Sequence, residues 1–166
     1  MKAVYAGSFD CYTNGHHDIV RKACRLFDEV HIVIAVNSAK SRTFSAEEMA
    51  GAIRAALRRE EIENCTVAIY RGLVAEYCRE NEIDYFIRGL RNNLDYNYEE
   101  NVANVNKLVM PDMDTIYFRA ETPAISSSMV RELHAYGEDV SAYVPAEVWE
   151  CIQAQKPDNF FTRKTE

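Results

Sequence analysis

The chain has 166 residues, of which 48% are hydrophobic and 27% charged, a composition typical of one soluble globular domain. The formal net charge of −7 disfavours general binding to nucleic acid, because contact along a phosphate backbone needs a basic surface. No apolar run approaches the roughly 20 residues of a membrane span, and residues 1–4 begin a strand rather than the apolar core of a signal peptide. Five scattered cysteines without Cys-x-x-Cys spacing predict reduced thiols in a cytoplasmic protein, with neither a disulfide framework nor a zinc site.

Strand and helix patterns alternate along the chain. In chain order they predict a strand at 4–6, a helix at 18–27, a strand at 30–36, a helix from about 46 through 57, a strand at 66–70, a helix at 73–80, a strand at 85–87, a helix at 94–109, a strand at 115–118, and helices at 128–136 and 146–155. This alternation predicts an α/β, Rossmann-like fold with a five-stranded parallel sheet and helices on both faces. We expect a single domain over residues 1–156 and a polar, flexible tail over residues 157–166.

The run GSFDCYTNGH at residues 7–16 links the first strand to the first helix. Small residues between a strand and a helix N-terminus are typical of phosphate sites, because the first helical N–H groups are unpaired and the helix dipole favours an anion. His16 stands at the helix entry, where a neutral imidazole donates one hydrogen bond and a charged one donates two. His17 points roughly 100° away and is interpreted as structural. Asp10 in this loop would either orient backbone or help to place a metal.

Ligands of parallel sheets bind beyond the carboxyl ends of the strands, and polar segments follow every expected strand. They bring several cations toward one edge of an acidic protein: Lys40, Arg42, Arg71, Arg88, Arg91 and Arg119. The run RGLR at 88–91 places two guanidinium groups around a glycine, which suits phosphate recognition because the glycine would let a ligand approach the backbone. The run ISSSMVR at 125–131 puts three hydroxyls at a helix start, more than capping requires.

Together these motifs resemble those of the phosphopantetheine adenylyltransferases over residues 2–154. The runs TNGH at 13–16 and ISSSMVR at 125–131 resemble the two signatures of the nucleotidyltransferase superfamily. The runs GSFD at 7–10, RGLR at 88–91 and DYNYE at 95–99, followed by Asn106, are typical of the phosphopantetheine enzymes. The chain departs from the family pattern at Cys11 and Arg42, where proline is usual, and at 122–124, where aromatic residues are usual.

The resemblance implies a role for each matching residue. His16 and Lys40 would stabilise the transition state. The residues implied in binding ATP are Ser8, Phe9, His16, Gly89, Leu90, Arg91, Glu99, Thr122, Pro123, Ala124, Ile125, Ser126, Ser127 and Ser128. The residues implied in binding the acceptor are Ser8, Lys40, Val74, Arg88 and Asn106, of which Lys40 and Arg88 would hold its phosphate.

The implied reaction is adenylyl transfer from ATP to 4′-phosphopantetheine, giving dephospho-coenzyme A and pyrophosphate. The resemblance also implies a homohexamer and Mg²⁺ that is held mainly by the ATP phosphates, with no protein metal ligand. Two alternatives stay open: a related nucleotidyltransferase that uses CTP or another acceptor such as nicotinamide mononucleotide, and a non-catalytic paralogue that binds nucleotide or coenzyme A. A redox role for Cys11 is a further hypothesis, because a positive loop would lower its thiol pKa.

Overall fold

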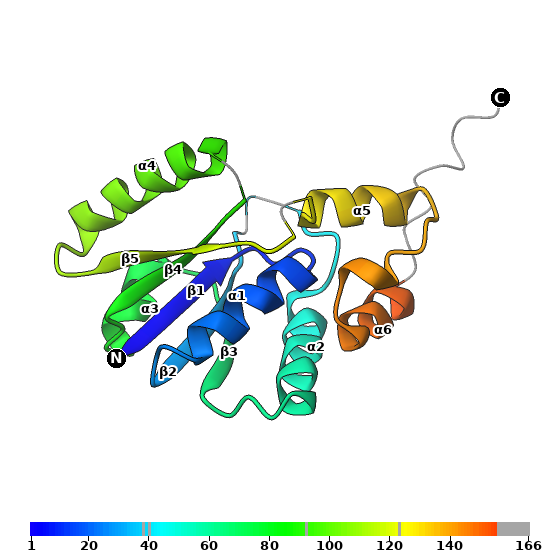
Figure 1. The fold of residues 1–166 in the computed structure, drawn as a ribbon, viewed down its shortest axis with the longest axis horizontal. Coiled ribbons are helices and arrows are strands. Elements are labelled where there is room, and N and C mark those ends of the chain that lie inside the picture. Colours follow the sequence, from blue (N-terminus) through cyan, green and yellow to red (C-terminus); the bar gives the residue numbers. More distant parts are fainter. Residues whose placement is uncertain (38, 40, 92, 123, 156–166) are drawn as a thin grey trace.

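The computed structural model describes residues 1–37, 39, 41–91, 93–122 and 124–155. Its centre is a parallel sheet of five strands in the order β3-β2-β1-β4-β5 (Figure 1). The strands are β1 (Lys2–Gly7), β2 (Glu29–Ala35), β3 (Cys65–Tyr70), β4 (Tyr85–Leu90) and β5 (Asp114–Arg119). The α/β class and the five-stranded parallel sheet predicted from the sequence are therefore confirmed.

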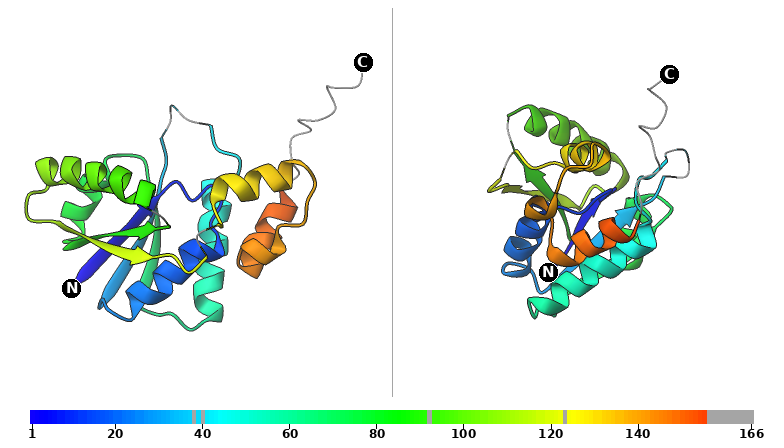
Figure 2. Two further views of the ribbon diagram at one scale, coloured as in Figure 1. Left: turned by 45° about the horizontal axis from the view of Figure 1, so that its top comes forward. Right: turned by 90° about the vertical axis from the view of Figure 1, so that its right-hand side faces the viewer.

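Helices cover both faces of this sheet. The helices are α1 (Asn14–Cys24), α2 (Ala46–Arg59), α3 (Val74–Glu80), α4 (Asn93–Val109), α5 (Ser127–Ala135) and α6 (Ala146–Ala154), with a 3₁₀ turn at Ser141–Tyr143. Helices α1 and α2 pack on one face, with α6 beside α2, whereas α3 and α4 lie on the other (Figures 1 and 2). Among the residues described, no helix is both long and apolar enough to cross a membrane.

Two apolar clusters hold the helices to the sheet. The larger cluster joins Ala3 and Tyr5 of β1 to buried side chains of α1, α2, α5 and α6. The smaller cluster joins Val4 of β1 to Cys78 of α3 and Phe86 of β4. Neighbouring residues of β1 enter different clusters because successive side chains of a strand point to opposite faces.

Helix α1 begins earlier than the sequence pattern predicted. The pattern placed this helix at residues 18–27, whereas it spans Asn14–Cys24. Thr13 is the N-cap: its hydroxyl accepts a hydrogen bond from the His16 backbone N–H, and the His16 ring accepts one from the Thr13 N–H. This reciprocal cap brings the small residues at 14 and 15 into the first turn, although apolar periodicity gives no sign of it. The 3₁₀ turn was not predicted, and residues 156–166, including the expected tail, lie outside the described chain.

The sheet opens between β1 and β4. β1 pairs with β2 along its whole length but with β4 only at Ala3 and Val4, so the carboxyl ends of β1 and β4 diverge. The strand order also reverses here, because the chain moves outward from β1 to β2 and β3 and then returns to β4 on the other side of β1. Parallel α/β sheets bind their ligands at such a reversal.

Candidate active site

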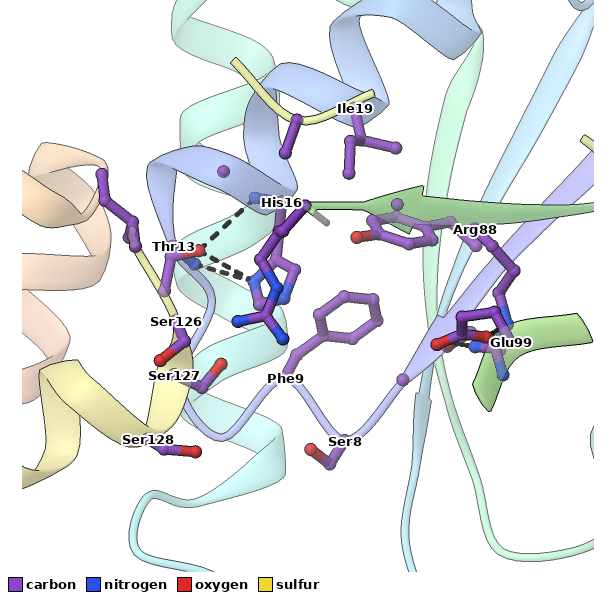
Figure 3. A pocket seen from close by; sticks show the side chains of 18 residues that line it. Ser8, Phe9, Thr13, His16, Ile19, Arg88, Glu99, Ser126, Ser127 and Ser128 are labelled. Atoms are coloured by element: carbon purple, nitrogen blue, oxygen red, sulfur yellow. Dashed lines mark hydrogen bonds and ion pairs between the residues drawn. The ribbon is translucent and has the colours of Figure 1, made fainter. Parts of the chain in front are cut away.

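A cavity of about 370 Å³ lies beyond the diverging ends of β1 and β4. Its walls come from the loop after β1, the first turn of α1, the end of β4, α4 and the N-terminus of α5. Figure 3 shows His16 and Phe9 near its centre, with the serines of residues 126–128 on one side and Arg88 and Glu99 on the other. Two helix N-termini therefore border one cavity, an arrangement that favours a ligand with more than one anionic group.

His16 presents a defined hydrogen-bond donor to this cavity. Its Nδ1 accepts from the Thr13 backbone N–H at 3.0 Å, so in the neutral ring Nε2 carries the proton (Figure 3). Burial, and to a lesser extent the positive charge of Arg91, lowers the pKa of His16 to about 4. Of the two charge states that the sequence left open, the structure selects the neutral donor.

His16 is therefore expected to stay neutral until the pH falls to about 4. Because the folded pKa lies below 6.5, the ordinary value for a histidine, the unfolded chain binds more protons between these two pH values. This contribution to stability is complete above pH 6.5 and is lost as the pH falls toward 4. The Cε1–H chemical shift of His16, followed by NMR against pH, measures the pKa, and the urea-unfolded chain provides the reference. A midpoint in the folded protein equal to that reference would contradict the assignment.

The loop after β1 is held by contacts from distant segments. The Asp10 carboxylate accepts hydrogen bonds from the backbone N–H groups of Thr43 and Phe44. The shortest distance from each nitrogen to a carboxylate oxygen is 2.9 Å. Asp10 thus orients backbone, the first of the two roles expected for it. On the other side, Ser127 Oγ donates to the Cys11 carbonyl at 2.7 Å, and the Arg131 guanidinium donates to the Asp10 carbonyl.

Cys11 is a buried core residue of this loop. It is fully inaccessible, and burial raises the pKa of its thiol to about 12. The redox hypothesis required an accessible thiol with a lowered pKa, so it is wrong for Cys11. His17, expected to be structural, is likewise buried, with Nδ1 3.2 Å from the Tyr12 hydroxyl and Nε2 3.2 Å from Glu60 Oε1.

Arg88 extends from β4 and is fixed by two contacts on its own side of the cavity. Its Nε lies 2.7 Å from Glu99 Oε2 on α4, and its Nη1 donates to the Ala6 carbonyl at 3.1 Å (Figure 3). Glu99 is thus part of the cavity wall rather than of a solvated helix face. Because an arginine held from behind loses little freedom on binding, this geometry suits recognition of a phosphate.

Gly89 has a packing reason that the sequence did not reveal. A glycine between two arginines was expected to let a ligand approach the backbone. A Cβ at Gly89 would instead lie 2.2 Å from Ile19 Cδ1, so the missing side chain leaves room for α1 to pack against β4. The glycine therefore sets how closely the first turns of α1, with His16, approach the sheet.

The three serines at the start of α5 have different surroundings. Ser126 is the N-cap and accepts from the Met129 N–H at 3.1 Å, while Ser127 is committed to the Cys11 carbonyl. Ser128 is exposed and borders the cavity (Figure 3). One hydroxyl caps the helix, one fastens the loop, and the third is available to a ligand together with the helix N-terminus.

Comparison with known proteins identifies the family. Residues 4–133 match the cytidylyltransferase-like family model. The phosphopantetheine adenylyltransferase of Cutibacterium acnes is 42% identical over 159 residues, covering 95% of this chain and 99% of the relative. That of Cytophaga hutchinsonii is 37% identical over 148 residues, covering 88% and 97%. The chain belongs to the phosphopantetheine adenylyltransferase family. The resemblance drawn from the sequence motifs is thereby confirmed.

Solved structures support the fold of this family member. A nicotinic acid mononucleotide adenylyltransferase of Plasmodium falciparum, complexed with NaAD, aligns with a TM-score of 0.67 at 16% identity, covering 95% of this chain and 97% of that one. A bifunctional NMN adenylyltransferase/ADP ribose pyrophosphatase of Francisella tularensis aligns with a TM-score of 0.72 at 13% identity, covering 92% and 48%. At these identities the likeness shows a shared fold.

The cavity brings together most of the residues to which the family resemblance gave a role. Those that border it are Ser8, Phe9, His16, Arg88, Gly89, Arg91, Glu99, Ile125, Ser126, Ser127 and Ser128. Those that do not border it are Val74, Leu90, Asn106, Thr122 and Ala124. Lys40 and Pro123 lie outside the described residues.

The cations expected at this edge divide into two groups. Arg88 and Arg91 border the cavity. Arg42 donates instead to the carbonyl of Ser8, and Arg71 forms an exposed ion pair with Glu47. Arg119 is exposed at the end of β5 and does not border the cavity.

Sequence reasoning missed apolar members of the wall. Tyr5, Ile19 and Ala120 also border the cavity. The alternation along β1 could have indicated Tyr5, because it shares a strand face with Gly7. No local pattern indicated Ile19, because apolar spacing along a helix does not tell a cavity wall from the core.

Proposed function

We propose that this chain transfers the adenylyl group of ATP to 4′-phosphopantetheine, forming dephospho-coenzyme A and releasing pyrophosphate. Its family supports the reaction class and both substrates. The observation that carries the site assignment is the meeting of the His16 imidazole with Arg88 and Arg91 at one cavity beside two helix N-termini. Such a site offers donors and positive charge to two phosphate-bearing substrates at once.

The reaction needs stabilisation of charge rather than a strong base. An oxygen of the acceptor phosphate attacks the α-phosphorus of ATP in line with the bond to the β-phosphate oxygen. The new P–O bond forms as the old one breaks, and its electron pair leaves with pyrophosphate. The attacking oxygen is already anionic, and Glu99 on the cavity wall is committed to Arg88. Positioning and electrostatic stabilisation therefore supply the catalysis.

His16 is assigned to the α-phosphate. Its Nε2–H donates to a non-bridging oxygen, and this bond strengthens as negative charge grows in the transition state. A neutral donor suffices, and the approaching phosphates favour a second proton on the ring by raising its pKa. Lys40, in the segment between β2 and α2, is assigned on the family resemblance to the acceptor phosphate with Arg88.

The remaining assignments follow the two faces of the cavity. ATP would lie against residues 89–91 and the N-terminus of α5, where Ser128 and the helix dipole meet its phosphates. The pantetheine arm would run from Arg88 past Val74 and Asn106. Val74 is the first residue of α3, and Asn106 lies on α4. These two helices cover the same face of the sheet.

Mg²⁺ is proposed to enter with ATP as part of the substrate. Within the described ranges, no group of three or more His, Cys, Asp or Glu side chains could hold a metal ion. Asp10 is occupied by backbone N–H groups and Glu99 by Arg88. The triphosphate would supply hard oxygen ligands of the kind that Mg²⁺ prefers, and the ion would neutralise charge on the leaving pyrophosphate.

A homohexamer in the cytoplasm is proposed from the family resemblance, with support from two features. Large apolar side chains are exposed near the end of α4, among them Val105 and Leu108, and exposed apolar groups favour an interface between copies. The five cysteines are free thiols, which suits a reducing compartment.

The activity is tested by measuring pyrophosphate release by the purified chain with ATP, Mg²⁺ and 4′-phosphopantetheine. Release should require all three and stop on addition of EDTA. Parallel reactions with CTP, or with nicotinamide mononucleotide as acceptor, test the related nucleotidyltransferases. Release with either of these but not with ATP and phosphopantetheine would contradict the proposal. Binding of both substrates without pyrophosphate release would instead identify the non-catalytic paralogue.

A further inference from the structure

Arg42 bridges two segments instead of facing the cavity. Its Nη1 donates to the Ser8 carbonyl at 2.6 Å, Nη2 to the Phe9 carbonyl at 3.5 Å and Nε to the Phe44 carbonyl at 3.2 Å. The planar guanidinium fork thus joins the loop after β1 to the segment before α2. All three contacts are to backbone carbonyls, so they differ from the phosphate-binding role expected of a cation at this sheet edge.

Asp10 joins the same two segments through a side chain of the loop after β1. Its carboxylate accepts from the backbone N–H groups of Thr43 and Phe44. The Phe44 side chain is buried in the larger apolar cluster, so the segment that carries Arg42 is anchored in the core. The two segments are therefore fixed to each other by one side chain from each.

Phe9 lies at the centre of this connection in a costly conformation. Its φ of 41° is in the left-handed region, which is unfavourable for a bulky residue and persists only where the surroundings hold it. The side chains of Arg42 and Asp10 supply contacts on both sides of this residue. The Phe9 ring meets the His16 ring edge to face, with centroids 5.1 Å apart.

We infer that Arg42 is a positioning residue: by holding the carbonyls of Ser8 and Phe9 it fixes the Phe9 ring and, through that ring, the imidazole of His16. The inference rests on the proposed function, in which His16 acts at the α-phosphate. It assigns no phosphate contact to Arg42, so removal of the arginine is expected to change kcat more than the KM of either substrate.

Arg42→Ala tests the inference against Arg54→Ala. Arg54 of α2 also donates to a backbone carbonyl, from Nη2 to Val67 O at 2.6 Å, but does not border the cavity. Arg42→Ala is expected to lower kcat about tenfold or more with little change in KM, because small displacements of catalytic groups are costly. Arg54→Ala should keep the wild-type kcat, and circular dichroism and thermal unfolding report whether each variant is folded.

Chemical rescue separates positioning from a general structural defect. Low millimolar guanidinium chloride should restore kcat in Arg42→Ala by occupying the vacated site, whereas sodium chloride at equal ionic strength should not. Wild type and Arg54→Ala should show no gain. If Arg42→Ala does not fold, Arg42→Lys carries the test, and its kcat should fall because one amine cannot bridge the same carbonyls.

The outcomes distinguish this inference from the proposed function. A folded Arg42→Ala with wild-type kcat, a loss confined to KM, or a loss without guanidinium rescue would each overturn the positioning role. So would a folded Arg42→Lys with full kcat if the alanine variant fails to fold. A wild-type enzyme that releases no pyrophosphate would instead overturn the proposed function.

Discussion

His16→Ala is expected to lower kcat by roughly 10²–10³, the usual cost of removing one donor that stabilises a transition-state charge. The reason lies in the orientation of the ring. The Thr13 backbone N–H occupies Nδ1, so the alanine variant loses the Nε2–H that faces the cavity. The helix should stay in place, because the Thr13 hydroxyl still caps the residue 16 N–H. Steady-state pyrophosphate release and thermal unfolding measure the two effects.

Two further variants control this result. His16→Gln retains an amide donor and should lose less kcat than His16→Ala. His17→Ala removes the neighbouring buried ring, which contacts Tyr12 and Glu60 and does not border the cavity. The His17→Ala variant should have a lower unfolding temperature than the wild type, while its kcat should stay close to the wild-type value. An unchanged kcat in a folded His16→Ala would refute the assignment of His16 to the α-phosphate.

Arg88→Ala is expected to lower kcat/KM for 4′-phosphopantetheine by about 10² or more, corresponding to about 3 kcal/mol for the loss of a partly buried, charge-paired donor. The variant removes the cation proposed for the acceptor phosphate. It also leaves the Glu99 carboxylate facing a site that must receive anions, because the 2.7 Å contact to Arg88 is lost. Initial rates at varied acceptor concentration and saturating ATP measure the effect.

Arg88→Lys and Arg71→Ala separate geometry from net charge. Lysine keeps the charge but cannot contact Glu99, the Ala6 carbonyl and a phosphate together, so its kcat/KM should stay well below wild type. Arg71→Ala removes a positive charge that follows β3, forms an exposed ion pair with Glu47 and does not border the cavity, so it should have little effect. A defect in Arg88→Ala confined to the KM of ATP would place this arginine in the nucleotide site instead.

The fold was predictable because its elements follow regular periods. The apolar run of β2 forms a buried strand, and spaced apolar residues of α1 and α2 such as Ile19 and Ile53 are buried as expected, whereas Val105 of α4 is exposed. The start of α1 was not predictable in the same way. It depends on a cap in which a histidine supplies the reciprocal contact from position 16, while the capping-box pattern names Glu or Gln.

The site was predictable in its residue types but less so in their states. Phosphate-binding motifs indicated His16 and Arg88, and both border the cavity. The neutrality of His16 depends on burial and on the charge of Arg91, which no local pattern encodes. Likewise, the contact between Arg88 and Glu99 joins a strand to a helix, and the orientation of Arg42 toward carbonyls depends on where the segment before α2 crosses the loop.

The hydrogen bonds that hold the loop after β1 come from residues that are synthesised at different times. The carbonyls of Ser8, Phe9, Asp10 and Cys11 accept hydrogen bonds from Arg42, Ser127 and Arg131. Ser127 and Arg131 follow the carbonyls that they hold by 116 and 121 residues in the sequence. Because synthesis runs from the N-terminus toward the C-terminus, the loop leaves the ribosome before either of these two donors. The motif at residues 7–16 is therefore present in a growing chain before the loop that contains it can take its final conformation.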